Sequence, residues 1–134
     1  MSCLVDSGLF IAYADQRDQW HTRSIGILRR ALNDREFGSV FLSDYIVDEV
    51  LTFTYSRIKD KERTLQLGRH LLSSDFNLLH VSPEVFQNAW ALFQKTSALS
   101  FTDCTTASLI QDHGIPTLLS FDSDFDLLGV HRIS

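Results

Sequence analysis

The amino-acid sequence predicts an α/β fold, a three-layer α/β/α sandwich with a central, mainly parallel sheet. Short apolar runs alternate with longer amphipathic segments along the chain, and this alternation is typical of parallel sheets with right-handed crossovers. The chain has 134 residues, enough for one domain with a substantial core. No repeat, low-complexity segment or linker divides residues 1–134, so we expect a single domain.

The first predicted strand is followed at once by an acid. Residues 3–5 are apolar and partly β-branched, which predicts a buried strand. Asp6 comes next, at a typical ligand position of an open α/β sheet, although Asp6 capping the next helix is the alternative. Ser7 is a good N-cap, and residues 9–13 predict a short buried helix. After a polar loop, apolar and basic residues interleave over residues 20–34 and predict an amphipathic helix.

The second strand is predicted at residues 39–42, and Ser43 caps the helix that follows. The buried stripe of this helix is assigned to Ile46, Val50 and Phe53. Glu49 falls in the same stripe, whereas Asp48 points away. A carboxylate on a buried face is costly, so we expect Glu49 to reach solvent, pair with an arginine or bind a cation.

The middle of the chain continues the alternation. A mixed-charge break at residues 59–63 precedes a helix over about 62–74, and residues 77–81 predict the third strand. Pro83 stands in the first turn of the next helix. The core-facing residues of that helix are predicted to be Phe86, Ala89, Trp90 and Phe93.

The last part of the chain is expected to carry a helix, two strands and an acidic turn. Thr102 caps a helix over residues 103–113, in which Asp103 starts a buried stripe, and Gly114 ends it. Strands are predicted at residues 115–119 and 130–133. The turn between them carries acids at alternate positions, namely Asp122, Asp124 and Asp126. A solvated acidic turn is the simple interpretation of that stretch.

Other acids occupy equally unusual positions. Asp6 and Asp122 follow strands, and both Glu49 and Asp103 lie on inward helix faces. Because the carboxyl ends of parallel strands share one edge of the sheet, we expect these acids to converge. Their repulsion must then be offset by a cation or by tight hydrogen bonding, and hard oxygen ligands suit Mg²⁺ or Mn²⁺. Such ions activate water and stabilise the leaving oxygen in phosphodiester cleavage.

Composition excludes several functional classes. No apolar run approaches the ~20 residues that cross a membrane, and the first residues lack signal-peptide features. We therefore expect a cytoplasmic protein with no membrane contact. Cys3 and Cys104 are too few and too far apart for a disulfide framework or a zinc site, so we interpret both as buried hydrophobic residues.

Basic residues are concentrated in the first half. Residues 1–70 hold ten of the twelve Lys and Arg residues and ten acids, whereas residues 71–134 hold two basic residues and seven acids. Solvated helix faces are one interpretation. The other is that some basic residues flank the acidic cleft and hold the phosphates of a substrate. The candidates are Arg17, Arg23, Arg29, Arg30, Arg57, Lys59, Lys61 and Arg63.

Four short motifs resemble those of the PIN domain, most closely the VapC-like toxin ribonucleases. The first is VDSGLFI at residues 5–11, and the second is Ser43 followed by Glu49. The third is FTDCTTASLI at residues 101–110. The closing motif is LLSFDSDF at residues 118–125, in which Ser120 stands in for the usual threonine. The order and spacing of the motifs, over a shared chain length, make a strong signal together.

The resemblance implies a Mg²⁺- or Mn²⁺-dependent endoribonuclease with the PIN fold. The residues that match its catalytic and metal-binding acids are Asp6, Glu49, Asp103 and Asp122. Asp124 is the second choice for the last metal ligand, and the Ser120 hydroxyl is expected to orient the acids. The resemblance further implies an RNA substrate, a homodimer and, for toxins, a small antitoxin protein supplied in trans.

The main alternative is a PIN fold that binds RNA or assembles with partners without significant catalysis. The presence of all four acids argues against it. Other acidic sites fit less well, because an EF-hand would need glycine in place of Leu127 and glutamate in place of Ile133. A receiver domain would need a lysine after a late strand, and a dehalogenase-type phosphatase would need an acid in place of Gly8.

Overall fold

A five-stranded sheet forms the centre of the molecule, and all neighbouring strands run parallel in the order β3-β2-β1-β4-β5. The computed structural model describes residues 2–134. The strands are β1 (Ser2–Val5), β2 (Ser39–Ser43), β3 (Asn77–Leu79), β4 (Thr117–Leu119) and β5 (Arg132–Ile133). The predicted parallel sheet is therefore confirmed.

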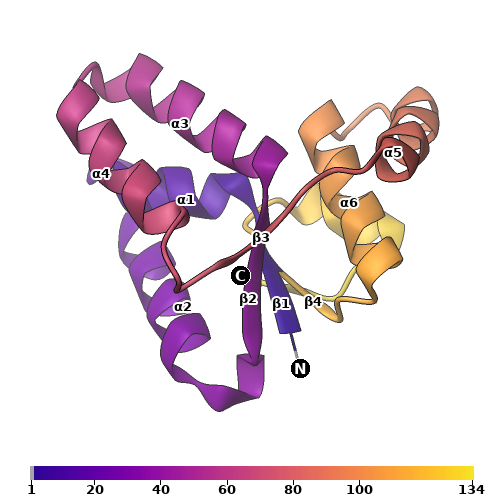
Figure 1. Cartoon of the computed structure of the whole chain (residues 1–134), viewed down its shortest axis with the longest axis horizontal. Coiled ribbons are helices and arrows are strands. Elements are labelled where there is room, and N and C mark those ends of the chain that lie inside the picture. Colours follow the sequence, from indigo (N-terminus) through magenta and orange to yellow (C-terminus); the bar gives the residue numbers. More distant parts are fainter. Residues whose placement is uncertain (1) are drawn as a thin grey trace.

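Helices cover both faces of the sheet. The α-helices are α1 (Ser7–Ala14), α2 (His21–Asn33), α3 (Asp44–Ile58), α4 (Lys61–Leu71), α5 (Pro83–Lys95) and α6 (Phe101–His113). Two 3₁₀ segments are η1 (Arg35–Phe37) and η2 (Ser123–Leu128). The group α1–α4 lies on one side of the sheet and the pair α5 and α6 on the other (Figure 1). This arrangement is the predicted α/β/α sandwich.

Local sequence signals explain where the helices begin and end. Hydroxyl or carboxylate side chains cap five α-helices by accepting a backbone N–H bond, and these N-caps are Asp6, Ser43, Asp60, Ser82 and Ser100. Gly114 ends α6 in the left-handed conformation, with φ of 63°, as its sequence context predicts. Among residues 2–134, no helix combines the length and apolarity that a bilayer span requires.

The core lies between the sheet and its two helical layers. Leu4, Leu42 and Leu118, from three neighbouring strands, are fully buried. Ile46 and Val50 of α3 are equally buried, as predicted. Cys3 and Cys104 are buried and free, which confirms their interpretation as core residues.

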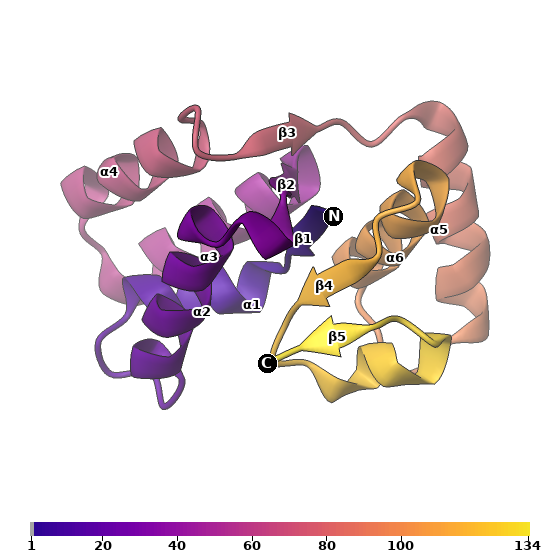
Figure 2. The same ribbon diagram turned by 90° about the horizontal axis from the view of Figure 1, so that it is seen from below.

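The strand order reverses at β1, with β2 on one side and β4 on the other. The backbone N–H of Asp6 donates to the Leu119 carbonyl at 3.0 Å, so Asp6 lies beside Ser120, the first residue after β4. Figure 2 shows β4 and β5 side by side, with η2 leading from one strand to the other. The carboxyl ends of strands at such a reversal are where doubly wound sheets bind ligands.

Aromatic residues predicted for the core are instead exposed. Phe86, Trp90 and Phe93 of α5 are 40%, 49% and 37% exposed, and Phe53 of α3 is 43% exposed. Helix α5 belongs to the outer layer and packs on α6, so Val85 and Ala89 suffice to fill that contact. The helical spacing correctly predicts that the aromatic residues of α5 share one side of the helix, but that side is exposed and does not face the core.

Several predicted boundaries also differ. Helix α6 begins at Phe101 and is capped by Ser100, not by Thr102, because the Ser100 hydroxyl reaches the N–H three residues later. Asp6 rather than Ser7 caps α1. Helix α4 covers Lys61–Leu71, and strands β3 to β5 are each shorter than predicted, since parallel pairing stops where the neighbouring strand turns away.

Candidate active site

Asp6 is buried at the carboxyl end of β1, with 4% of its surface exposed. Its Oδ1 accepts a hydrogen bond from the Ser7 backbone N–H at 2.9 Å, and Oδ2 accepts one from the Ser120 hydroxyl at 2.7 Å. Asp6 is therefore the N-cap of α1, the alternative that the sequence left open. A carboxylate has about four acceptor sites, so the capping bond leaves it free to bind a ligand as well.

Glu49 reaches the same place from α3. The Ser7 hydroxyl donates to Glu49 Oε1 at 2.6 Å, so Ser7 contacts two of the predicted acids. Glu49 is half-buried and its neighbour Asp48 is exposed, which confirms the predicted orientation of the helix. Within residues 2–134, the ion pairs involve other acids, so the alternative of an arginine partner for Glu49 is not realised.

Asp103 lies in the first turn of α6. Its Oδ2 accepts the Ser100 backbone N–H at 3.0 Å, while the Ser100 hydroxyl accepts the Asp103 N–H at 3.1 Å. This capping box fixes the side chain at the positive end of a helix. The buried stripe expected to start at Asp103 is formed instead by other residues of α6: Cys104, Thr105, Ser108 and Leu109.

Ser120 connects the first and last acids of the chain. Its hydroxyl donates to Asp6 and accepts the Asp122 backbone N–H at 3.0 Å. Asp122 then caps η2 by accepting the Asp124 N–H at 2.9 Å. Both Asp122 and Asp124 are half-buried, so the stretch is an ordered capped turn rather than a freely solvated one.

Burial and mutual repulsion raise the pKa values of two of the acids. Burial raises the pKa of Asp6 from 3.8 to about 7, and the charges of Asp103 and Glu49 push this pKa the same way, while hydrogen bonds from Ser120 and Ser7 oppose the rise. Burial also raises the pKa of Asp103, with further upward contributions from Asp122 and Glu49. Acids from four distant parts of the chain are thus near enough to act on each other.

The donor set fits a hard divalent cation. All the converging ligands are carboxylates, which Mg²⁺ and Mn²⁺ prefer, and none of the ion pairs within residues 2–134 neutralises them. In the described structure no three Asp, Glu, His or Cys side chains already surround a single point. A shared cation would therefore draw the half-buried side chains inward from their present rotamers.

Arg132 is a residue that the sequence did not single out. Its side chain is 16% exposed. Nη1 donates to the Ser120 carbonyl at 3.1 Å, and Nε and Nη2 donate to the Asp126 carboxylate at 3.0 and 3.1 Å. One guanidinium thus clamps both ends of the turn that carries Asp122. A lone arginine six residues after an acid offers no distinctive signal in sequence.

The basic residues predicted to flank the cleft have mixed environments. Arg57 lies 3.3 Å from Asp15 and 3.7 Å from Asp18, and Arg17 lies 3.3 Å from Asp15. These pairs tie the loop after α1 to the end of α3. Arg17 nevertheless keeps 75% of its side chain exposed, so it stays available to a ligand.

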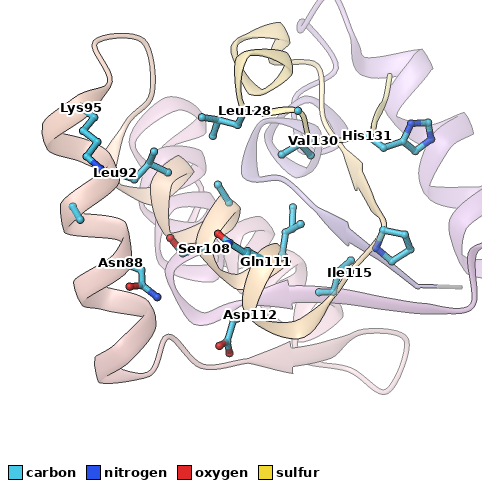
Figure 3. A pocket seen from close by; sticks show the side chains of 15 residues that line it. Asn88, Leu92, Lys95, Ser108, Gln111, Asp112, Ile115, Leu128, Val130 and His131 are labelled. Atoms are coloured by element: carbon cyan, nitrogen blue, oxygen red, sulfur yellow. The ribbon is translucent and has the colours of Figure 1, made fainter.

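A large cavity lies elsewhere. It has a volume of about 960 Å³ and lies between α5, α6 and the segment before β5 (Figure 3). Lys95, Gln111 and His131 are among its lining residues, and none of the predicted acids contributes to it. The carboxylates therefore form a site separate from this cavity.

Comparison with known proteins shows the family of the chain. The PIN domain profile matches residues 3–130. The VapC ribonuclease of Archaeoglobus fulgidus is 25% identical over 135 aligned positions, which cover 98% of this chain and 84% of that protein.

Solved structures share the fold. The crystal structure of Mycobacterium tuberculosis VapC20, described as a Sarcin-Ricin loop cleaving toxin, has a TM-score of 0.87 at 20% identity, with 98% of both chains covered. VapBC2 from Rickettsia felis, bound to a DNA fragment from their promoter, has a TM-score of 0.73 at 15% identity and covers 99% of this chain and 98% of that one. Because the PIN domain profile matches nearly the whole length of this chain, the chain belongs to the PIN-domain family.

Proposed function

We propose that this chain, as a single PIN-like domain, is a Mg²⁺- or Mn²⁺-dependent endoribonuclease. The observation that carries the proposal is the convergence of Asp6, Glu49, Asp103 and Asp122. Besides burial, the charges of Asp103 and Glu49 raise the pKa of Asp6, and those of Asp122 and Glu49 raise the pKa of Asp103. Within residues 2–134, none of the four acids has an ion-pair partner. Carboxylates without a counter-charge, gathered where the strand order reverses, raise the free energy of the folded state unless a cation binds between them.

Each residue has a role in the proposed mechanism. A bound divalent ion would supply an activated water and stabilise the leaving oxygen of the phosphodiester. Asp6 and Asp103 would hold the ion, with Glu49 and Asp122 binding it directly or orienting its water. Ser120 would keep Asp6 in place through its 2.7 Å hydrogen bond.

Asp122 is the preferred ligand from the last motif. Asp122 raises the pKa of Asp103 by its charge, whereas Asp124 directs its own backbone N–H to Asp122. Asp124 remains the second choice. Substituting each by asparagine separately, and comparing Mg²⁺ affinity by calorimetry, would distinguish the two.

The substrate is proposed to be RNA because the curated relative is a ribonuclease and VapC20 is described as cleaving the Sarcin-Ricin loop. The test is cleavage of RNA by the pure protein with EDTA, Mg²⁺ or Mn²⁺. Asp6→Asn, Asp103→Asn and Glu49→Gln should each reduce cleavage by at least about 100-fold. Asp48→Asn is the matched control, since Asp48 is the exposed neighbour of Glu49 on α3 and its loss should change little.

Two outcomes would contradict the proposal. Equal cleavage by the wild type and the acid variants would indicate a contaminating nuclease. Binding of RNA without cleavage at any divalent metal would favour the alternative of a PIN-fold binding or assembly module.

We also propose a toxin role with a small antitoxin supplied in trans. The likeness to VapC20, described as a toxin, supports this role, because a ribonuclease that damages its own cell must be held inactive. Expression of the wild type should arrest growth, and Asp103→Asn should not. Co-expression of the neighbouring short reading frame should relieve the arrest, and failure of every such frame to do so would count against the pairing.

A homodimer is proposed through the exposed face of α5. Phe86, Trp90 and Phe93 share one side of that helix. No charged residue lies between Glu84 and Lys95. For a chain of net charge −5, a neutral aromatic face allows two copies to meet without like-charge repulsion.

Light scattering tests the dimer. The wild type should be dimeric and Trp90→Lys monomeric. Leu72→Lys, which alters a residue 59% exposed at the end of α4, should leave the dimer intact. A monomeric wild type at high concentration would contradict the proposed interface.

A further inference from the structure

A stacked aromatic pair lies next to the acidic site. The rings of Trp20 and Phe121 have centroids 5.1 Å apart and an interplanar angle of 16°. The other aromatic pairs within residues 2–134 are tilted or edge-to-face. Phe121 stands between Ser120 and Asp122 in sequence, so the stack begins at the turn that carries the last acid.

Trp20 remains accessible despite the stack. It is 42% exposed, whereas Phe121 is half-buried beneath it. A large aromatic side chain that is both stacked and exposed presents a flat surface to solvent. Such a surface offers a nucleobase the same contact that Phe121 already makes.

The loop that carries Trp20 is held firmly. The Trp20 backbone N–H donates to Asp18 at 2.8 Å, and Asp18 also pairs with Arg57 of α3. His21 Nδ1 lies 2.8 Å from the Ala12 carbonyl, which ties the start of α2 to α1. Because the indole is already positioned, a ligand stacking on it would pay little ordering cost.

Cationic side chains surround the same loop. Arg17 is 75% and Arg57 38% exposed at the side chain. Both line a cavity of about 330 Å³ together with Arg63, and Asp15 is among the other residues of its lining. Arg57 is linked to the Trp20 backbone through Asp18. Guanidinium groups on the loop that also carries an accessible indole suit a ligand that combines a planar ring with phosphates.

We infer that Trp20, backed by Phe121, is a stacking platform for an unpaired nucleobase of single-stranded RNA beside the scissile phosphate. The inference rests on the proposed function for the identity of the substrate. The aromatic face of α5 is a poorer candidate for this role. No basic residue lies between Phe86 and Phe93, and none of the acids of the site lies on that helix.

The chain permits a direct test because it has two tryptophans, Trp20 and Trp90. In the Trp90→Phe variant, Trp20 is the sole source of tryptophan fluorescence. Titration with a short unstructured oligoribonucleotide in EDTA, where metal-dependent cleavage is absent, should quench this fluorescence. The Trp20→Phe variant, which retains Trp90, is the matched control and should show little quenching. The same oligonucleotide with single abasic positions should identify the stacked base by loss of quenching.

Kinetics provide the second readout. Trp20→Ala should weaken RNA affinity by about 5- to 150-fold, the range expected for loss of one base–aromatic stack. The effect should appear in KM rather than kcat, because stacking holds the base equally before and during the reaction. Trp20→Phe should restore most of the affinity, because a phenyl ring can stack on a base in the same place.

The outcomes separate this inference from the proposed function. If the wild type cleaves RNA and Trp20→Ala cleaves it with unchanged KM, the platform is refuted and the nuclease stands. If the wild type cleaves no RNA but Trp20 is quenched by it, the platform stands and the catalytic proposal fails. Absence of quenching in the Trp90→Phe variant overturns the platform even if Trp20→Ala does not fold.

Discussion

Replacing Asp6 by asparagine should stabilise the protein in the absence of metal, although it removes a residue proposed to be essential. Asp6 is buried and has a pKa raised to about 7. Folding therefore favours its protonated form. At neutral and higher pH the folded chain must keep a buried charge beside Glu49 and Asp103, which the amide of asparagine avoids.

The magnitude follows from the shift of the pKa. A change from 3.8 to about 7 corresponds to roughly 4 kcal/mol between the protonated and ionised forms. Because the folded-state pKa is the higher one, the contribution of Asp6 to stability is fully present below about pH 4 and is lost as pH rises through 7. Roughly 2 to 3 kcal/mol of this loss falls between about pH 5 and pH 8.

The substitution also has a cost. In the Asp6→Asn variant the side-chain oxygen can still accept the Ser7 N–H, but the amide nitrogen replaces the oxygen that accepts the Ser120 hydroxyl. Losing one hydrogen bond costs about 1 kcal/mol. The expected net gain at about pH 8 is therefore on the order of 3 kcal/mol, and near pH 4 the variant should be no more stable than the wild type.

Urea unfolding in EDTA, followed by circular dichroism across this pH range, measures the effect. The difference between Asp6→Asn and wild type should grow as pH rises. Asp15→Asn is the contrasting control, because hydrogen bonds from Arg17 hold the pKa of Asp15 below its ordinary value. Loss of the Asp15 carboxylate should therefore destabilise the folded protein at neutral pH. A difference between Asp6→Asn and wild type that is flat with pH would refute the buried-charge argument.

Further substitutions test the supports of the site. Ser120→Ala should cost about 1–3 kcal/mol by urea unfolding, because it leaves Oδ2 of the buried Asp6 and the Asp122 N–H without a partner, and Ser120→Thr should retain most of the stability. Arg132→Gln should reduce RNA cleavage about tenfold by loosening the turn around Asp122, with a loss of only about 1 kcal/mol in stability, since Asp126 is exposed. Gly114→Ala should cost about 1 kcal/mol, because nothing lies within 4 Å of an added Cβ and only the positive φ opposes it. Mg²⁺ at about pH 8 should raise the melting temperature of the wild type but not that of Asp103→Asn, and an equal rise would contradict the metal site.

Positions that depend on the parallel sheet could be predicted from sequence. Asp6 and Ser120 each directly follow an apolar run, and the pairing of β1 with β4 brings them together. The prediction needed only the rule that parallel strands end at one edge. Glu49 was predictable because Ile46 and Val50 fix which side of α3 faces inward.

Positions that depend on packing between layers could not be predicted from sequence. The stripe of Phe86, Trp90 and Phe93 has the spacing of a core face, yet α5 is an outer helix with that stripe exposed. Periodicity states that one side of a helix is apolar, not what covers it. The stack of Trp20 on Phe121 joins residues about 100 positions apart in the sequence. Arg132 binds Asp126, which lies six residues before it. No local sequence pattern predicts either contact.

The hydrogen bonds of the site explain how like charges can be held together without being neutralised. Asp6 is bound by the Ser7 N–H and the Ser120 hydroxyl, Glu49 by the Ser7 hydroxyl, and Asp103 by the Ser100 N–H. These neutral donors orient the carboxylates but add no positive charge. Guanidinium groups at the same positions would bind the acids more strongly and leave less negative charge for a cation. The half-buried Arg132 binds Asp126, and of the four acids its charge also acts on Asp122, so the negative potential of Asp6, Glu49 and Asp103 remains available to a divalent ion.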